Sequence, residues 1–129
     1  MKPLIVRQNE IEEFYTEERC FIKELLNSGA DPGLSFALAR VEPGVTTVLH
    51  SLKDTSERYL IIAGHGKMEV GTLPPTSVSE GDLVLIPPDT PQRITNDGSR
   101  DLIFCCICAP RFTPSVYMDL ERSDIGNPG

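Results

Sequence analysis

Short apolar runs recur along the chain, and each is broken after a few residues by glycine, proline, asparagine or aspartate. Runs of this length, bounded by turn-forming residues, are typical of β-strands. No long segment shows the period of about 3.6 residues that marks an amphipathic helix. Short strands with a turn every 8 to 12 residues or so predict an all-β sandwich or barrel. The runs are 19–26 (RCFIKELL), 34–41 (LSFALARV), 46–51 (TTVLHS), 58–63 (RYLIIA), 67–70 (KMEV), 82–87 (DLVLIP), 92–95 (QRIT) and 101–108 (DLIFCCIC).

Alternation along three of these runs places polar residues on faces that also carry apolar ones. Successive side chains of a strand point to opposite sides, so residues two apart share a face. The three faces carry Thr46, His50 and Leu52, then Glu57 and Tyr59, then Gln92, Ile94 and Asn96. If all three faces line one interior, His50, Glu57 and Gln92 converge from three strands. Alternation alone leaves open whether these strands are neighbours.

Length and charge limit the class of protein. A chain of 129 residues has the size of one domain, and we expect it to cover 1–129, with a barrel core over about 19–110. We expect an N-terminal arm over 1–18 and a frayed tail over about 119–129. A net charge of −7 argues against nucleic acid and against an anionic membrane as partners. The chain has no signal-peptide core and no apolar run of about 18 residues, which predicts a cytoplasmic protein.

The four cysteines are predicted to be small buried side chains. Cys20 stands alone, whereas Cys105, Cys106 and Cys108 crowd into one strand-like run. Adjacent residues on a strand point to opposite faces, so Cys105 and Cys106 are poorly placed to form a disulfide with each other. This pattern is typical of small hydrophobic residues on a core strand.

The spacing of glycines and polar residues resembles the two motifs of the cupin superfamily. The first motif reads G-x5-H-x-H-x3/4-E-x6-G and the second reads G-x5-P-x-G-x2-H-x3-N. The matching residues are Gly44, His50, Glu57 and Gly64 in the first motif, and Gly81, Pro87 and Asn96 in the second. Leu52 replaces the second histidine, Asp89 replaces a glycine, and Gln92 replaces the last histidine. The resemblance, over 44–96, implies a small antiparallel jelly-roll barrel, the RmlC-like double-stranded β-helix.

The resemblance also implies a candidate metal site. In cupins, the histidines and the glutamate of the two motifs commonly hold one divalent ion. Here His50 and Glu57 remain, and the Gln92 carbonyl offers a third ligand, so a single Mn²⁺, Fe²⁺, Zn²⁺ or Ni²⁺ ion is a candidate cofactor. The alternative is that His50, Glu57 and Gln92 form a hydrogen-bonded pocket floor without a metal.

Two functions follow from the resemblance, and both stay open. The first is a divalent-metal-dependent enzyme that acts on a sugar derivative or an organic acid. The second is a non-catalytic cupin that binds or senses a metabolite and has a degenerate metal site. In either case the partner is a small molecule, and without a metal His50 or Glu57 could still act as a general base. The remaining pocket residues expected from the pattern are Thr46, Leu52, Tyr59, Ile94 and Asn96.

A homodimer is also expected. Small cupins typically pair through edge strands, and an open barrel of this size leaves strand edges that need to be covered. The candidate contact segments are 3–6 (PLIV) and 19–26 (RCFIKELL).

Overall fold

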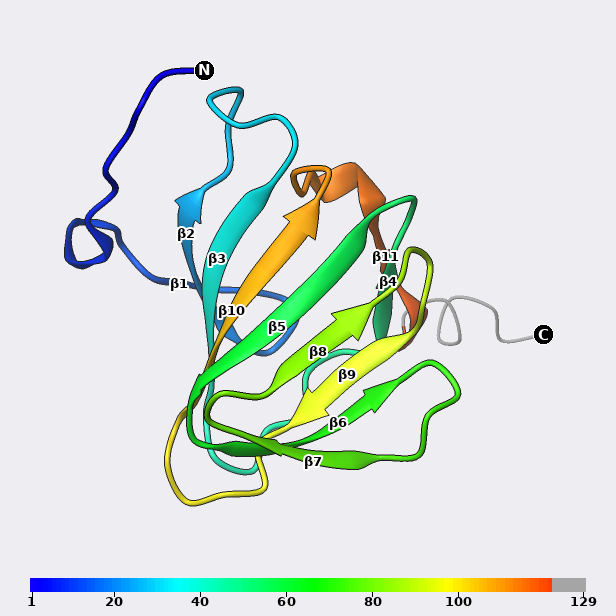
Figure 1. Ribbon diagram of the computed structural model, residues 1–129. Coiled ribbons are helices and arrows are strands. Elements are labelled where there is room, and N and C mark those ends of the chain that lie inside the picture. Colours follow the sequence, from blue (N-terminus) through cyan, green and yellow to red (C-terminus); the bar gives the residue numbers. More distant parts are fainter. Residues whose placement is uncertain (122–129) are drawn as a thin grey trace.

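The computed structural model describes residues 1–121 and consists mainly of two antiparallel β-sheets (Figure 1). The six-stranded sheet has the order β1 (Phe14–Tyr15), β2 (Phe21–Leu26), β3 (Ser35–Val41), β10 (Leu102–Ala109), β5 (Ser56–Ala63) and β8 (Leu83–Ile86). The five-stranded sheet has the order β11 (Tyr117–Asp119), β4 (His50–Leu52), β9 (Gln92–Thr95), β6 (His65–Val70) and β7 (Thr76–Ser79). Two single turns of 3-10 helix, η1 (Gln8–Glu10) and η2 (Pro114–Val116), lie near the chain ends. The prediction of an all-β fold is confirmed.

Strand β10 organises the six-stranded sheet because it pairs with β3 on one side and β5 on the other. Phe104 lies opposite Ala39 of β3 and Ile61 of β5, and all three side chains are buried. The alternation of β10 brings Cys106 and Cys108 onto the same inner face as Phe104. The sheet therefore presents one continuous inner wall.

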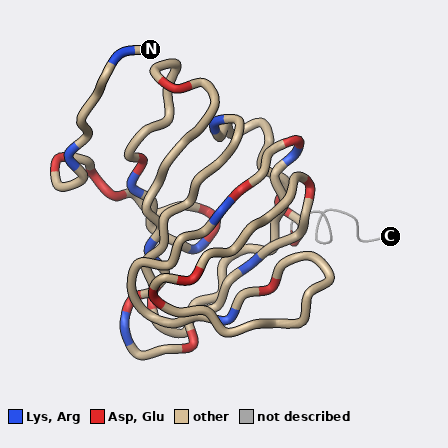
Figure 2. The backbone as a smooth tube through the Cα atoms, in the orientation of Figure 1, with Lys and Arg blue, Asp and Glu red and all other residues tan. Residues whose placement is uncertain are grey.

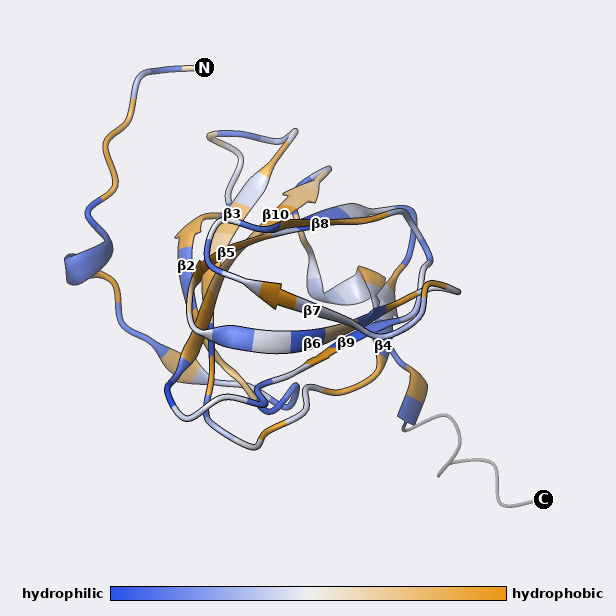
Figure 3. Ribbon diagram, turned by 60° about the horizontal axis from the view of Figure 1, so that its bottom comes forward, coloured by the Kyte–Doolittle hydropathy of each residue, from blue (hydrophilic) through white to orange (hydrophobic). Residues whose placement is uncertain are grey.

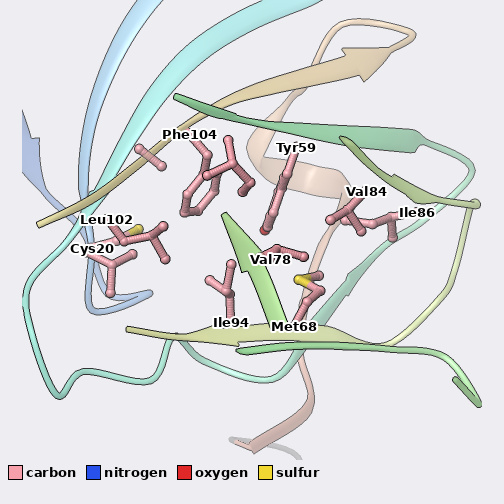
Figure 4. Packing of buried hydrophobic residues seen from close by; sticks show 12 residues of the cluster. Cys20, Tyr59, Met68, Val78, Val84, Ile86, Ile94, Leu102 and Phe104 are labelled. Atoms are coloured by element: carbon pink, nitrogen blue, oxygen red, sulfur yellow. The ribbon is translucent and has the colours of Figure 1, made fainter. Parts of the chain in front are cut away.

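The core lies between the two sheets, as Figure 4 shows. Tyr59 and Phe104 come from the six-stranded sheet, and their ring centroids are 4.3 Å apart. Met68 and Ile94 come from the five-stranded sheet and are almost fully buried. Burying a large apolar side chain stabilises a fold by roughly 1.5–3 kcal/mol, so this cluster holds the sheets together.

Four positions of the cupin-like motifs, Gly44, Gly64, Gly81 and Asp89, have left-handed backbone. Gly64 has a φ of 87°, and a Cβ at this position would lie 2.6 Å from the carbonyl oxygen of Asp101. Only glycine fits there. Asp89 has a φ of 64°, and its side chain accepts a hydrogen bond from the backbone N–H of Asp54 at 3.3 Å. Aspartate is one of the few residues that tolerate this conformation, which explains how it can stand where the motif has glycine.

The strand boundaries differ from prediction mainly in the five-stranded sheet. Within the expected run 46–51, only the last residues belong to β4, and Thr46 makes a single bridge to Thr95. The sequence pattern did not predict β1, β7 and β11, each of which is four residues or shorter. The last residues of the predicted tail, 122–129, lie outside the described part of the chain.

Charged residues of both signs are spread along the chain (Figure 2). In Figure 3, β8 and β10 are coloured as hydrophobic, and the outer side chains Leu83 and Leu85 are 64% and 60% exposed. No helix within residues 1–121 is long and apolar enough to span a membrane.

The predicted homodimer stays a prediction. Of its two candidate contact segments, 3–6 is exposed and precedes the sheets, and 19–26 includes β2, which β1 covers at the sheet edge.

Candidate functional site

A cavity of about 250 Å³ opens on the inner face of the six-stranded sheet. Strands β2, β3, β5 and β10 form its wall, and segments 14–20 and 112–114 contribute to its rim. Small-molecule pockets usually measure about 300–1,000 Å³, so this one suits a small ligand. The lining side chains are Phe14, Thr16, Glu18, Cys20, Ile22, Glu24, Asn27, Ser35, Phe36, Ala37, Ala39, Thr47, Glu57, Tyr59, Phe104, Cys106, Cys108, Phe112 and Pro114.

Glu57 is the centre of a buried hydrogen-bond chain on this wall. Gln92 Nε2 donates to Glu57 Oε1 at 2.8 Å, and Gln92 Oε1 accepts from the Tyr59 hydroxyl at 2.6 Å. The Cys108 thiol donates a weaker bond to Glu57 Oε2 at 3.5 Å. Glu57 and Tyr59 are two residues apart on β5, so both point inward, and Cys108 lies opposite Glu57 in the sheet register. These hydrogen bonds therefore fix the carboxyl group of Glu57 and both the oxygen and the nitrogen of the Gln92 amide.

Burial raises the pKa of Glu57 above its ordinary value of 4.5. The hydrogen bond from Gln92 and the His50 imidazole act in the opposite direction, and the nearby Glu18 carboxyl adds to the rise. Removal from water disfavours the charged form of a carboxyl group, and a second carboxyl nearby disfavours it further. Glu57 therefore holds its proton to a higher pH than an exposed glutamate.

His50 lies beside this chain, on β4. It is opposite Gln92 in the β4–β9 register, and its ring stacks on Tyr117 with centroids 5.1 Å apart. His50 Nδ1 lies 2.7 Å from the backbone carbonyl oxygen of Val48. A carbonyl can only accept, so Nδ1 carries the proton in this bond.

Glu18 is a cavity residue that the sequence pattern did not reveal. Its backbone carbonyl accepts a hydrogen bond from the N–H of Val48 at 3.2 Å, which ties the arm to the barrel. Burial raises the pKa of the Glu18 carboxyl, against the influence of His50. In the sequence Glu18 belongs to an acid-rich stretch, NEIEEFYTEE, whose composition suits a short helical turn or a solvated lead-in. The backbone contact with Val48 holds this segment against the barrel, and Glu18 is among the residues that line the cavity.

The thiols around the cavity remain protonated. Burial raises the pKa of Cys20 to about 12, and burial together with the Glu57 charge raises the pKa of Cys108 and Cys106. Cys20 and Cys108 are buried, and all four cysteines are free thiols. These side chains therefore act as small apolar wall residues.

The structure gathers only part of the predicted pocket around the cavity. Glu57 and Tyr59 line it, and His50 and Gln92 lie beside or behind them. Leu52 and Ile94 are buried, while the Thr46 hydroxyl bonds to Thr95 at 2.8 Å. The Asn96 amide donates to the carbonyl oxygens of Val41 and Arg100 and so closes a turn. Ligand contact by this second group stays a prediction.

The predicted metal ligands His50, Glu57 and Gln92 stay a prediction, and the hydrogen bonds of Gln92 compete with metal binding. Within residues 1–121 no three histidine, cysteine, aspartate or glutamate side chains are grouped to hold a metal. The Gln92 oxygen already accepts from Tyr59, and its amide nitrogen is directed at Glu57. Leu52 supplies no donor atom where the motif has histidine.

Comparison with known proteins places this architecture in a family. The profile of the cupin domain matches residues 37–108. The uncharacterized protein MJ1618 of Methanocaldococcus jannaschii is 34% identical over 113 residues, which are 85% of this chain and 90% of that protein.

Solved structures share the fold at lower identity. KdgF from Halomonas sp. has a TM-score of 0.78 at 15% identity, over 88% of this chain and 99% of that one. A predicted oxalate decarboxylase from Thermotoga maritima has a TM-score of 0.72 at 23% identity, over 83% and 99%. Streptomyces PAC13 with uridine, a protein described as a nucleoside dehydratase, has a TM-score of 0.76 at 19% identity, over 93% and 92%. The fold is the predicted jelly-roll barrel, and the chain belongs to the cupin family.

Proposed function

We propose that this cupin is an enzyme that transfers protons to and from a small organic molecule held in the cavity, with Glu57 as the acid–base group. The observation that carries the proposal is a buried carboxyl group with a raised pKa on the wall of a ligand-sized cavity. A general acid or base works best when its pKa lies near the working pH, and burial is how proteins move a carboxyl group there.

The hydrogen bonds assign different tasks to the two oxygens of Glu57. Oε1 accepts from Gln92, whose orientation is fixed in turn by Tyr59. Within residues 1–121, the hydrogen bond of Oε2 is the weak one from the Cys108 thiol at 3.5 Å. Oε2 is therefore the atom that exchanges a proton with the ligand, while Gln92 and Tyr59 act as positioning residues.

Glu18 supplies a second carboxyl group to the same cavity. The two carboxyl groups are close enough to interact, because the charge of Glu18 raises the pKa of Glu57. Two titratable groups with different environments can act as acid and base in one reaction. In an elimination of water, one carboxylate takes a proton from carbon and the other carboxyl group gives a proton to the departing hydroxyl, so that the C–O bond breaks without net charge change.

The neighbours support a hydroxylated substrate. One of them is described as a nucleoside dehydratase and has uridine bound, and dehydration needs both proton transfers just described. Another is described as a predicted oxalate decarboxylase, which names an organic acid instead. We therefore propose a sugar derivative or nucleoside as the substrate class, with an organic acid as the competing class.

Hydrogen–deuterium exchange tests the proposal because it detects proton transfer at carbon whatever product forms. The protein is incubated in D₂O with a panel of nucleosides, sugar derivatives and organic acids, and loss or shift of substrate C–H signals is followed by proton NMR. Glu57→Gln keeps the acceptor for Gln92 but cannot carry the proton, so exchange should fall by about 10²–10⁴-fold. Glu69→Gln, which alters an outer ion pair with Arg93, is the control and should leave exchange unchanged.

Two outcomes would refute proton transfer by Glu57. Equal exchange by wild type and Glu57→Gln would assign the chemistry to another group. Saturable binding of a panel member without exchange or turnover would support the metabolite-binding alternative. The metal-dependent enzyme stays a prediction, and the titration described in the Discussion tests it.

A further inference from the structure

Among residues 1–121, the side chains that line the cavity include carboxyl groups and no basic group. Glu18, Glu24 and Glu57 contribute carboxyl groups to the lining. Among the lining residues within the described part of the chain there is no lysine, arginine or histidine. A buried anion without a cationic or hydrogen-bonding partner is strongly disfavoured, so a ligand anion in this cavity would need such a partner on the wall.

Two basic side chains next to lining residues have partners of their own. Arg111 Nη1 donates to Asn27 Oδ1 at 2.9 Å, and Asn27 Nδ2 donates to Glu24 Oε2 at 2.8 Å. His50 directs Nδ1 to the Val48 carbonyl and stacks its ring on Tyr117. An anionic ligand would therefore find no free cationic side chain on the cavity wall.

The other lining groups favour an apolar or cationic face. Phe14, Phe36, Phe104 and Phe112 place aromatic rings around the space, with Tyr59 on the same wall as Phe104. Aromatic faces are electron-rich, so they attract cations and stack on flat apolar groups, but they repel anions. The mouth carries one of these rings, because Phe14 is 48% exposed.

We propose that the cavity selects small molecules that carry no negative charge, either uncharged or cationic and with a flat apolar face, and that it excludes carboxylates and phosphates. This inference rests on the proposed use of the cavity as the ligand site. It narrows the substrate class from "sugar derivative or organic acid" to the uncharged member, such as a nucleoside or a neutral sugar derivative.

Three probes of the same shape separate charge from size. Benzamide is uncharged, benzamidinium is cationic and benzoate is anionic, and an apolar cavity of about 150 Å³ already admits benzene. Each is titrated into wild-type protein near neutral pH, and backbone N–H shifts of β2 and β3 report occupancy by NMR. Benzamide and benzamidinium should bind at least about tenfold more tightly than benzoate.

A charge-reversal variant makes the test two-sided. Glu18→Lys places a cation in the cavity and should move the preference toward benzoate, with Glu18→Gln as the matched neutral variant and thermal melts as the check on folding. Benzoate binding as tight as benzamide in wild type, or no β2 and β3 shifts with any probe, would overturn the inference. Deuterium exchange with Glu57→Gln is a separate experiment. The probe titrations can therefore refute the predicted ligand charge without refuting proton transfer by Glu57, and the exchange experiment can do the reverse.

Discussion

Replacing Glu57 by glutamine should make the protein less sensitive to alkaline pH. The amide keeps an oxygen that accepts from Gln92 Nε2, so the hydrogen bond of 2.8 Å survives. What the variant loses is a titrating group that is buried and only 7% exposed. The perturbation therefore isolates the cost of ionising one carboxyl group inside the barrel.

The sign and size of the effect follow from linkage. In the unfolded chain Glu57 loses its proton around the ordinary value of 4.5, while burial raises its pKa in the folded protein. Above that value the folded state binds more protons than the unfolded state, so stability falls as the pH rises toward the folded pKa. One carboxyl group contributes a slope of at most about 1.4 kcal/mol per pH unit. Glu18, whose pKa burial also raises, contributes a slope of the same sign.

Urea denaturation at several pH values between about 5 and 8 measures this slope. The free energy of unfolding of Glu57→Gln, relative to wild type, should rise with pH over that range. At its steepest, the rise should be about 1.4 kcal/mol per pH unit, the value for one titrating group. Glu69→Gln is the control, because Arg93 lowers the pKa of Glu69 and its contribution is already complete above 4.5. The difference in the free energy of unfolding between Glu69→Gln and wild type should therefore be the same at every pH in this range. A constant offset for Glu57→Gln as well would mean that Glu57 is ionised in the folded protein, and the proposed acid–base role would lose its basis.

Three further predictions concern the hydrogen-bond chain, the metal and the assembly. Tyr59→Phe should lower the free energy of unfolding by about 1–3 kcal/mol, because Gln92 Oε1 loses its donor in a buried site, and urea melts measure the loss. Leu52→His should bind Mn²⁺, Zn²⁺ or Ni²⁺ more tightly than wild type in isothermal titration, because it adds an imidazole. Adding His50→Ala to this variant should abolish the gain in affinity. Equal affinities of wild type and Leu52→His would show that a second imidazole does not rebuild the site. Sedimentation equilibrium at micromolar concentration should give twice the chain mass of 14.2 kDa, whereas a species of single-chain mass would refute the homodimer.

The fold could be predicted because its signals are local. The strands β3, β5 and β10 are apolar runs closed by turn residues, and Gly64 and Asp89 adopt the backbone that their motif positions require. The exception is the run at 46–51. The Thr47 hydroxyl donates to the carbonyl of Ile94 and accepts from its N–H, and the Thr47 N–H donates to the same carbonyl at 2.9 Å, so side-chain and backbone bonds together join this run to β9. A propensity pattern cannot distinguish these two ways of pairing with β9.

The candidate site could be predicted only where it lies on regular strands. Glu57, Tyr59 and Gln92 were grouped by alternation, and hydrogen bonds join them in the structure. Glu18 was missed because its position depends on a tertiary contact of the arm with Val48, which no local pattern encodes. Asn96 shares a face with Gln92, but its amide is engaged in a turn. Alternation assigns a face and does not assign the partner that a polar side chain finds there.

The departures from the cupin motif at positions 52 and 92 point in one direction. A glutamate that holds a metal must be ionised, whereas a glutamate that delivers a proton must keep it, so one position needs opposite surroundings for the two tasks. Leucine at 52 removes an imidazole donor, and glutamine at 92 replaces another imidazole with an amide that cannot carry a charge. What remains around Glu57 is a buried wall of thiols, an amide and aromatic rings, in which burial outweighs the groups that favour the carboxylate. Under the proposed acid–base role, Leu52 and Gln92 give Glu57 the surroundings of an acid and not those of a metal ligand, and histidine at either position should lower the pKa of Glu57.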